Sequence, residues 1–143
     1  MLTIKEVSEK YGISQDTLRY YERIGLIPPV PRTPGGIRDY QEKDLGWVEQ
    51  AVCMRSAGVQ IEALIEYVRL YQMGDSTIEA RRDLLQEQYE VLEEQRRQIN
   101  ATMERLKYKI SRYQKAVETG VLSWEKKRRI RKCILRRSTD RLM

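Results

Sequence analysis

The sequence predicts a mainly α-helical protein with a small head followed by one long helix. Apolar residues recur at helical spacing in short stretches of the first 74 residues. All four prolines lie between residues 28 and 34, which interrupts the helical pattern once. From residue 75 no proline or glycine occurs before Gly120, and apolar residues repeat every seven positions. We therefore expect a head at 1–74, a long helix at 75–118 and a basic tail at 119–143.

A first short helix is expected directly after Thr3. Ile4, Val7 and Tyr11 are spaced so that they share one helical face. Thr3 is a favourable N-cap residue, and Gly12 is a favourable residue for ending the helix. The first helix is therefore bounded on both sides by local signals.

A second short helix is expected after a turn at residues 11–14. Ser14 is suited to cap it, and Leu18, Tyr21 and Ile24 form its inward stripe. Two short helices joined by such a turn are typical of a helix-turn-helix. The outward positions near the start of its second helix, where such a motif can meet base edges and phosphates, are Gln15, Thr17, Arg19 and Tyr20.

The segment 27–40 predicts a small β-hairpin. Its prolines exclude a helix, and Gly35 and Gly36 provide the permissive backbone of a tight turn. Arg32 and Arg38 bracket the tip of the hairpin. We interpret it as a wing that projects cationic side chains beside the second helix, with a merely structural loop as the alternative.

Two further helices complete the expected head. The first runs from residue 42 to 56 and the second ends near residue 74, with glycines at 58 and 74 as stops. Their apolar positions are Leu45, Val48 and Val52 in the first, and Ile61, Leu64, Ile65 and Val68 in the second.

The long helix carries a heptad pattern. Ser76 and Glu79 have the spacing of a capping box at its start. Its two apolar series are Ile78, Leu85, Leu92, Ile99, Leu106 and Tyr113, and Tyr89, Met103, Ile110 and Val117. Arg82 and Arg96 interrupt the second series, so the charges at these positions can select the orientation of the pair. Six heptads give a rod on the order of 60 Å, too long to be covered by so small a head. We expect a coiled-coil homodimer, with a single exposed helix as the alternative.

Composition narrows the class of protein. Residues 124–143 hold nine basic and two acidic side chains, whereas the remainder holds eighteen basic and nineteen acidic, so bulk charge alone does not indicate nucleic-acid binding. The tail is expected to be either a basic helix or a solvated end that adds non-specific affinity for nucleic acid. The sequence contains no histidine, no paired carboxylates and no phosphate-binding glycine loop. We therefore expect no enzyme, metal or cofactor.

Location follows from the lack of apolar segments. There is no apolar run long enough for a membrane span and no signal peptide, so we expect a cytoplasmic, nucleoid-associated protein with no membrane partner. The two cysteines, Cys53 and Cys133, are then expected to be reduced.

Two motifs make the resemblance to a known family specific. DTLRYYERIGL at residues 16–26 and GIRDY at 36–40 resemble the opening of the MerR family of bacterial regulators. The resemblance implies a homodimer with an antiparallel coiled coil that binds an inverted repeat in promoter DNA. It also implies that the dimer distorts the promoter spacer so that RNA polymerase can use it, and thereby activates transcription. The DNA contacts carried over by motif are Arg19, Tyr20, Arg38, Tyr40 and Arg55.

Cys53 is the candidate sensor. The segments AVCMRSAG at 51–58 and GDSTIEAR at 74–81 resemble the thiol-based NmlR/AdhR-like branch of that family. The resemblance implies that Cys53 reacts with electrophiles such as aldehydes, or responds to nitrosative stress, and so controls detoxification genes. The alternatives are a regulator with a buried, inert Cys53 and no thiol sensing, and a coiled-coil interaction module whose head binds another protein.

Overall fold

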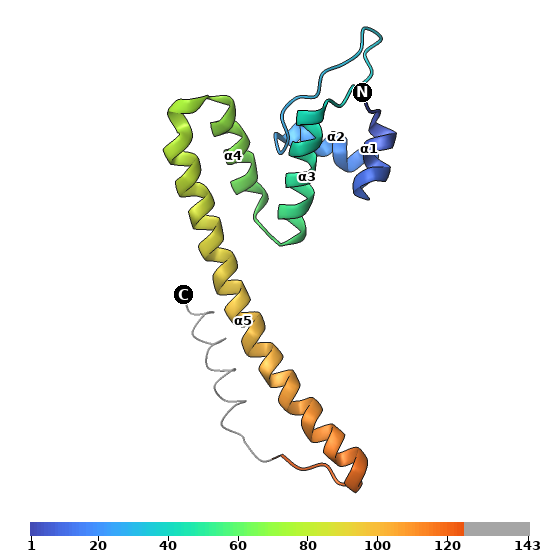
Figure 1. Ribbon diagram of the computed structural model, residues 1–143, viewed down its shortest axis with the longest axis vertical. Helices are drawn as coiled ribbons and strands as arrows, with labels where there is room; N and C mark the ends of the chain where they lie inside the picture. The colour runs from blue at the N-terminus through green and yellow to red at the C-terminus, as the bar shows by residue number, and fades with distance from the viewer. Residues whose placement is uncertain (125–143) are drawn as a thin grey trace. The chain divides into compact units, whose positions relative to one another are not determined.

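The computed structural model describes residues 1–124 and is mainly α-helical, as predicted (Figure 1). The predictions for most of the basic tail, including Cys133, lie outside the described residues. The elements are α1 (Ile4–Tyr11), α2 (Gln15–Ile24), α3 (Glu42–Ser56), α4 (Ile61–Gln72), the 3-10 turn η1 (Asp75–Thr77) and α5 (Ile78–Thr119). The chain forms two compact units that divide between Tyr89 and Glu90. We call the first unit, Met1–Tyr89, the head.

The first two helices are bounded by the predicted caps. The Thr3 backbone N–H donates to Glu6 Oε1 at 3.0 Å, and the Glu6 N–H donates to Thr3 Oγ1 at 3.2 Å. These bonds lower the pKa of Glu6. The Ser14 hydroxyl accepts the Thr17 N–H at 3.0 Å and so caps α2. Gly12 follows α1 with a φ of 68°, a left-handed conformation that favours glycine.

The wing is a hairpin with minimal pairing. Arg32 and Arg38 form one antiparallel bridge, and the Thr33 N–H donates to the Ile37 carbonyl at 2.7 Å across the turn. The Asp39 N–H donates to the Pro31 carbonyl at 2.8 Å. Within residues 1–124 these contacts do not extend into longer strands, because the prolines on the first arm have no N–H to donate. The hairpin was predicted correctly, but its strands are shorter than that prediction suggested.

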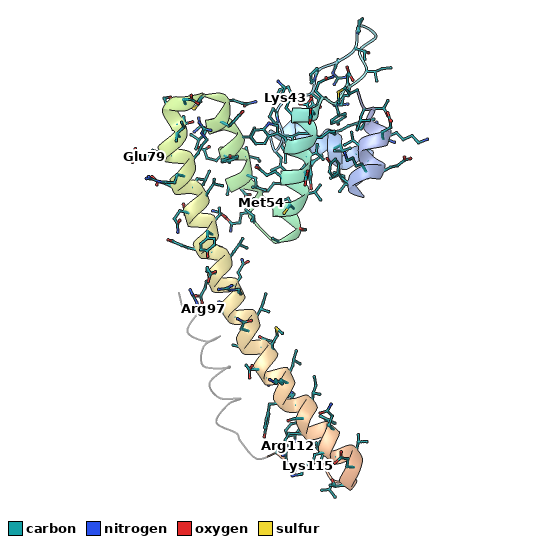
Figure 2. All side chains as sticks on the ribbon, viewed as in Figure 1. Lys43, Met54, Glu79, Arg97, Arg112 and Lys115 are labelled. Carbon is teal, nitrogen blue, oxygen red and sulfur yellow. The ribbon has the colours of Figure 1, made fainter. Side chains whose placement is uncertain are left out.

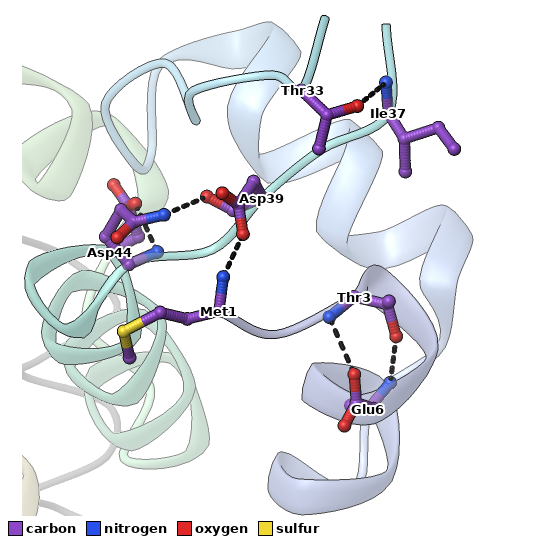
Figure 3. A network of polar contacts seen from close by, with 8 residues as sticks. Met1, Thr3, Glu6, Thr33, Ile37, Asp39 and Asp44 are labelled. Carbon is purple, nitrogen blue, oxygen red and sulfur yellow. Dashed lines mark hydrogen bonds and ion pairs between the residues drawn. The ribbon is translucent and has the colours of Figure 1, made fainter. Parts of the chain in front are cut away.

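A polar network ties the base of the wing to both neighbouring segments (Figure 3). The N-terminal ammonium of Met1 pairs with the Asp39 carboxylate. The Gln41 side chain donates to the Asp39 carbonyl at 3.1 Å, and the Gln41 backbone N–H donates to the Asp44 carboxylate at 2.8 Å. Asp44 is buried at the start of α3, so this bond both caps the helix and satisfies a buried charge.

The head contains its own hydrophobic core. Helices α3 and α4 form a helical hairpin, and α4 is followed in the reverse direction by the beginning of α5 (Figure 1). The buried apolar residues are Val7, Leu18, Leu26, Ile27, Val30, Tyr40, Val48, Ala51, Val59, Leu64 and Val68. Every helix from α1 to α4 and the wing contribute to this list, so the wing is packed as part of the head.

Thr77 organises the junction between α4 and α5. Its hydroxyl lies 2.6 Å from the Leu70 carbonyl and 2.7 Å from the Gly74 carbonyl, and it accepts from Arg81 Nε at 3.0 Å. The Arg81 guanidinium also lies over the Tyr71 ring, whose other neighbour is Trp47 at 4.9 Å between ring centroids. Helix α5 therefore begins at Ile78, three residues after the predicted start at residue 75. Thr77 and Arg81 make the polar contacts of this junction, in place of the capping box predicted for Ser76 and Glu79.

Helix α5 has 42 residues and none of them is buried. The apolar series that was predicted to form a seam is largely exposed, for example 59% at Ile99 and 53% at Leu106. Charged side chains such as Arg97, Arg112 and Lys115 project from the same helix (Figure 2). None of the described helices is long and apolar enough to cross a membrane.

Candidate nucleic-acid interface

The first turns of α2 present the residues that were predicted to contact DNA. Arg19 is half exposed, and its guanidinium donates to the Asp16 carboxylate at 2.9 Å and to Gln15 Oε1 at 3.4 Å. These contacts are exposed, so they hold the side chain weakly. The Thr17 hydroxyl lies 2.8 Å from the Ser14 hydroxyl and therefore belongs to the helix cap.

Tyr20 lies on the exposed surface of α2. It is 39% exposed, and the Arg23 guanidinium lies over its ring at 5.3 Å from the centroid. Arg23 was not predicted as a site residue, although its spacing of three residues from Tyr20 indicates that the two share a helix face. The pair combines an aromatic hydroxyl and a cation on one surface, which suits contact with a phosphate backbone.

The two arginines of the wing have different surroundings. Arg32 is exposed at the turn, where Nη1 donates to the Gly36 carbonyl at 3.0 Å. Arg38 is only 19% exposed in its side chain and pairs with Glu22 of α2, with 2.7 Å between Nε and Oε1. Glu22 was also missed by the sequence analysis, because a pairing across sixteen residues leaves no local signal.

Tyr40 does not lie where the prediction requires it. The residue is fully buried, and its hydroxyl oxygen has no hydrogen-bond partner among residues 1–124. Burial raises the pKa of Tyr40. A side chain inside the core cannot touch DNA in this conformation, so the prediction of Tyr40 as a DNA contact is corrected. The physical reason is its position in the fold, because Tyr40 pairs with Leu2 at the point where the chain enters the core.

Two predicted site residues lie near the end of α3. Arg55 is exposed and donates from Nη1 to the Val59 carbonyl at 2.6 Å. The Cys53 thiol is free and exposed. The alternative of a buried Cys53 is therefore wrong, and its reactivity stays a prediction. Across residues 1–124 no three or more acidic, cysteine or histidine side chains gather in a way that could hold a metal ion.

Comparison with known proteins agrees with this arrangement. A family model described as MerR family regulatory protein matches residues 3–40. The regulator AdhR of Bacillus subtilis is 55% identical over 84 residues, which are 59% of this chain and 60% of AdhR. A solved structure from Listeria monocytogenes, named for a MerR family transcriptional regulator, has 44% identity and a TM-score of 0.80. That match covers 84% of this chain and 91% of the Listeria chain. The chain belongs to the MerR family.

A second solved structure is relevant to the interface. HiNmlR, described as a MerR family regulator lacking the sensor domain and bound to promoter DNA, is 34% identical with a TM-score of 0.75. The match covers 82% of this chain and 94% of HiNmlR. The segment matched by the MerR family model spans α1, α2 and the wing, which carry most of the candidate contacts. These MerR-family relatives are transcriptional regulators by their descriptions, and so is this chain by family membership.

Proposed function

We propose that this protein binds promoter DNA through α2 and the wing and regulates transcription there. The main support is the exposed face of α2, where Arg19 and Tyr20 lie beside a wing that Glu22 joins to the same helix. A planar guanidinium can recognise guanine or phosphate, and a tyrosine hydroxyl can donate to phosphate. The contacts we propose are Gln15, Thr17, Arg19, Tyr20, Arg32, Arg38 and Arg55.

Dimerisation through α5 is the second part of the proposal. Its apolar series is exposed in the single chain, and such a stripe is stable in water when a partner helix covers it. In a parallel pair Arg82 and Arg96 would each face their own copies at the seam, which places like charges together. In an antiparallel pair with full overlap, Arg82 faces Tyr113 and Arg96 faces Ile99 of the second copy. We therefore propose the antiparallel orientation.

Charge along α5 supports the same orientation. Residues 78–98 hold six acidic and four basic side chains, whereas residues 99–119 hold two acidic and five basic. Antiparallel pairing puts the acidic half of one helix against the basic half of the other. The dimer then carries two heads, which suits an inverted repeat. We propose that it distorts the spacer between the promoter elements, so that the deformation of DNA controls access by RNA polymerase.

The DNA contacts can be tested with Arg19→Ala and a matched control. The control is Arg69→Ala, which removes an exposed arginine of α4 that pairs with Glu66 as Arg19 pairs with Asp16. Arg19→Ala is expected to weaken binding to the operator by about 1 to 3 kcal/mol and to reduce the preference for the operator over other DNA. Equal loss on all DNA would mean that Arg19 contacts phosphate only, and no loss would contradict the proposed interface.

Cys53 is the proposed effector site. Its thiol is exposed, and the similarity to AdhR supports a role in a stress response. With an aldehyde, the sulfur would bond to the carbonyl carbon, the carbonyl electron pair would move to the oxygen, and the oxygen would take the thiol proton. Addition of bulk at the end of α3 would then shift the head between two DNA-bound states.

Sensing can be separated from DNA binding. Mass spectrometry after exposure to an aldehyde, diamide or nitric oxide should show modification at Cys53. Cys53→Ala protein is expected to bind the operator normally and to lose the transcriptional response to aldehyde. If the Cys53→Ala variant still responds to aldehyde, Cys53 is not the sensor, and the protein is a MerR-family regulator without thiol sensing at this residue.

A further inference from the structure

Glu22 is an acidic side chain in the middle of the proposed DNA-binding surface. It lies on α2 between Arg19 and Arg23, and its side chain is only 14% exposed. A carboxylate so close to a polyanion opposes binding unless another group neutralises it. Its contacts show what neutralises it.

Both carboxylate oxygens of Glu22 are used by the wing. Oε1 accepts from Arg38 Nε at 2.7 Å, on the second arm of the hairpin. Oε2 accepts the Val30 backbone N–H at 3.2 Å, on the first arm. One side chain of α2 therefore fixes both arms of the wing, and the shorter bond is a charge-assisted one.

The pairing leaves part of the Arg38 guanidinium available. Arginine has five N–H donors, and Glu22 engages only the one on Nε. The described contacts give Nη1 and Nη2 no acceptor within residues 1–124. Glu22 thus holds the Arg38 guanidinium at Nε, which we call its inner edge. The outer edge, formed by Nη1 and Nη2, keeps the N–H donors that can bind a phosphate in a bidentate manner.

We propose that Glu22 is a positioning residue for DNA recognition, which aims the outer edge of Arg38 at a backbone phosphate and fixes the wing relative to α2. This inference rests on the proposed DNA-binding function. A negative charge near DNA would by itself weaken binding, whereas this proposal predicts that the Glu22 carboxylate strengthens it. Removing the charge of Glu22 therefore tests the proposal.

The experiment measures operator affinity against salt concentration for Glu22→Gln, Arg38→Lys, Arg38→Ala and the double variant of Glu22→Gln with Arg38→Lys. Glu22→Gln keeps the shape and removes a negative charge, yet it is expected to weaken binding about tenfold. The slope of log affinity against log salt should fall by about 0.9 for each phosphate that the protein no longer binds, hence by about 1.8 for a dimer. Arg38→Lys keeps the charge but removes the planar fork, so it is expected to weaken binding to a similar extent.

The double variant and two controls complete the test. Because both residues act through one contact, the double variant is expected to bind no more weakly than either single variant. Glu66→Gln removes a comparable acid from an ion pair on α4 and should leave affinity and slope unchanged. Thermal unfolding identifies a variant that fails to fold. If Glu22→Gln fails to fold, Arg38→Lys still tests the proposal, because lysine keeps the charge but has no planar fork for Glu22 to aim. Unchanged affinity and salt slope in Arg38→Lys would then overturn the positioning role.

The outcomes separate the two proposals. Tighter or unchanged binding by folded Glu22→Gln, together with a loss in Arg38→Ala, would overturn the positioning role and leave the DNA interface in place. Normal binding by Arg38→Ala would instead remove Arg38 from the interface. An additive loss in the double variant would show that Glu22 and Arg38 act independently, which also overturns the positioning role.

Discussion

The head and the long helix α5 are stabilised in different ways. In the head, residues from four helices and the wing are buried together, and Val7, Leu18 and Tyr40 have no exposed surface. In α5, none of the 42 residues is buried. The head therefore has a hydrophobic core of its own, whereas the apolar face of α5 would be covered only in the dimer that we propose.

The ion pairs differ in the same way. Those near the middle of α5 join residues three apart, such as Arg96 to Glu93 and Arg97 to Glu94, and they are largely exposed. Pairs of this kind contribute little to stability, because water screens them. The Arg38–Glu22 pair of the head joins distant segments and is largely buried. The Arg38–Glu22 pair therefore joins distant segments of the head, whereas the two pairs near the middle of α5 each join neighbours on one helix.

The largest effect is expected from a cavity in the head. Leu18→Ala removes a fully buried side chain, and such changes cost about 2 to 5 kcal/mol. The loss should be independent of protein concentration in urea unfolding followed by circular dichroism. Leu106→Ala on α5 is the matched change, and its effect should grow as the protein is diluted, since it weakens the association of two molecules. If both variants lost the same unfolding free energy at every protein concentration, α5 would be stabilised in the same way as the head, and the comparison of the two regions would be wrong.

A charge in the seam of α5 is expected to have the next largest effect. Leu106→Lys should dissociate the proposed dimer, because it would leave a charge without a partner inside the apolar interface of α5. Operator affinity should fall about a hundredfold or more, since each head then binds one half-site alone. Sedimentation at micromolar concentration measures the dissociation. Ser111→Lys adds the same charge at an exposed position outside the seam and should leave the dimer intact.

Local signals in the sequence predict much of this fold. Thr3, Ser14 and Gly12 bound the first two helices where expected, because capping depends on neighbouring residues alone. The heptad pattern likewise predicts α5, since its period is visible in the chain. The start of α5 was assigned less well. Thr77 rather than Ser76 makes the contacts there, because its role depends on the distant carbonyl of Leu70.

The candidate site shows the limit of local reasoning more clearly. Arg19 and Tyr20 were found because helical spacing identifies an outward face. Glu22 was missed because its partners, Val30 and Arg38, meet it only after the wing has folded back. Tyr40 was misplaced for the same reason. A motif predicts which residues matter, but burial decides whether a side chain faces the ligand or the core.

The smallest effect is expected at Tyr40, and it tests whether this side chain belongs to the core of the head or to the proposed DNA-binding surface. Tyr40→Phe removes a buried hydroxyl that has no partner among the described residues, so the head should gain about 1 kcal/mol of unfolding free energy. Because burial raises the pKa of Tyr40, the folded head holds the phenol proton more tightly than the unfolded chain. The stability that the folded head gains by keeping this phenol protonated is fully present below a pH of about 10, and it is lost as the pH rises through the pKa of Tyr40 in the folded state. Wild-type stability should therefore decline more steeply at high pH than that of Tyr40→Phe. Operator affinity should change less than about twofold, and a larger loss would mean that the hydroxyl leaves the core to meet DNA.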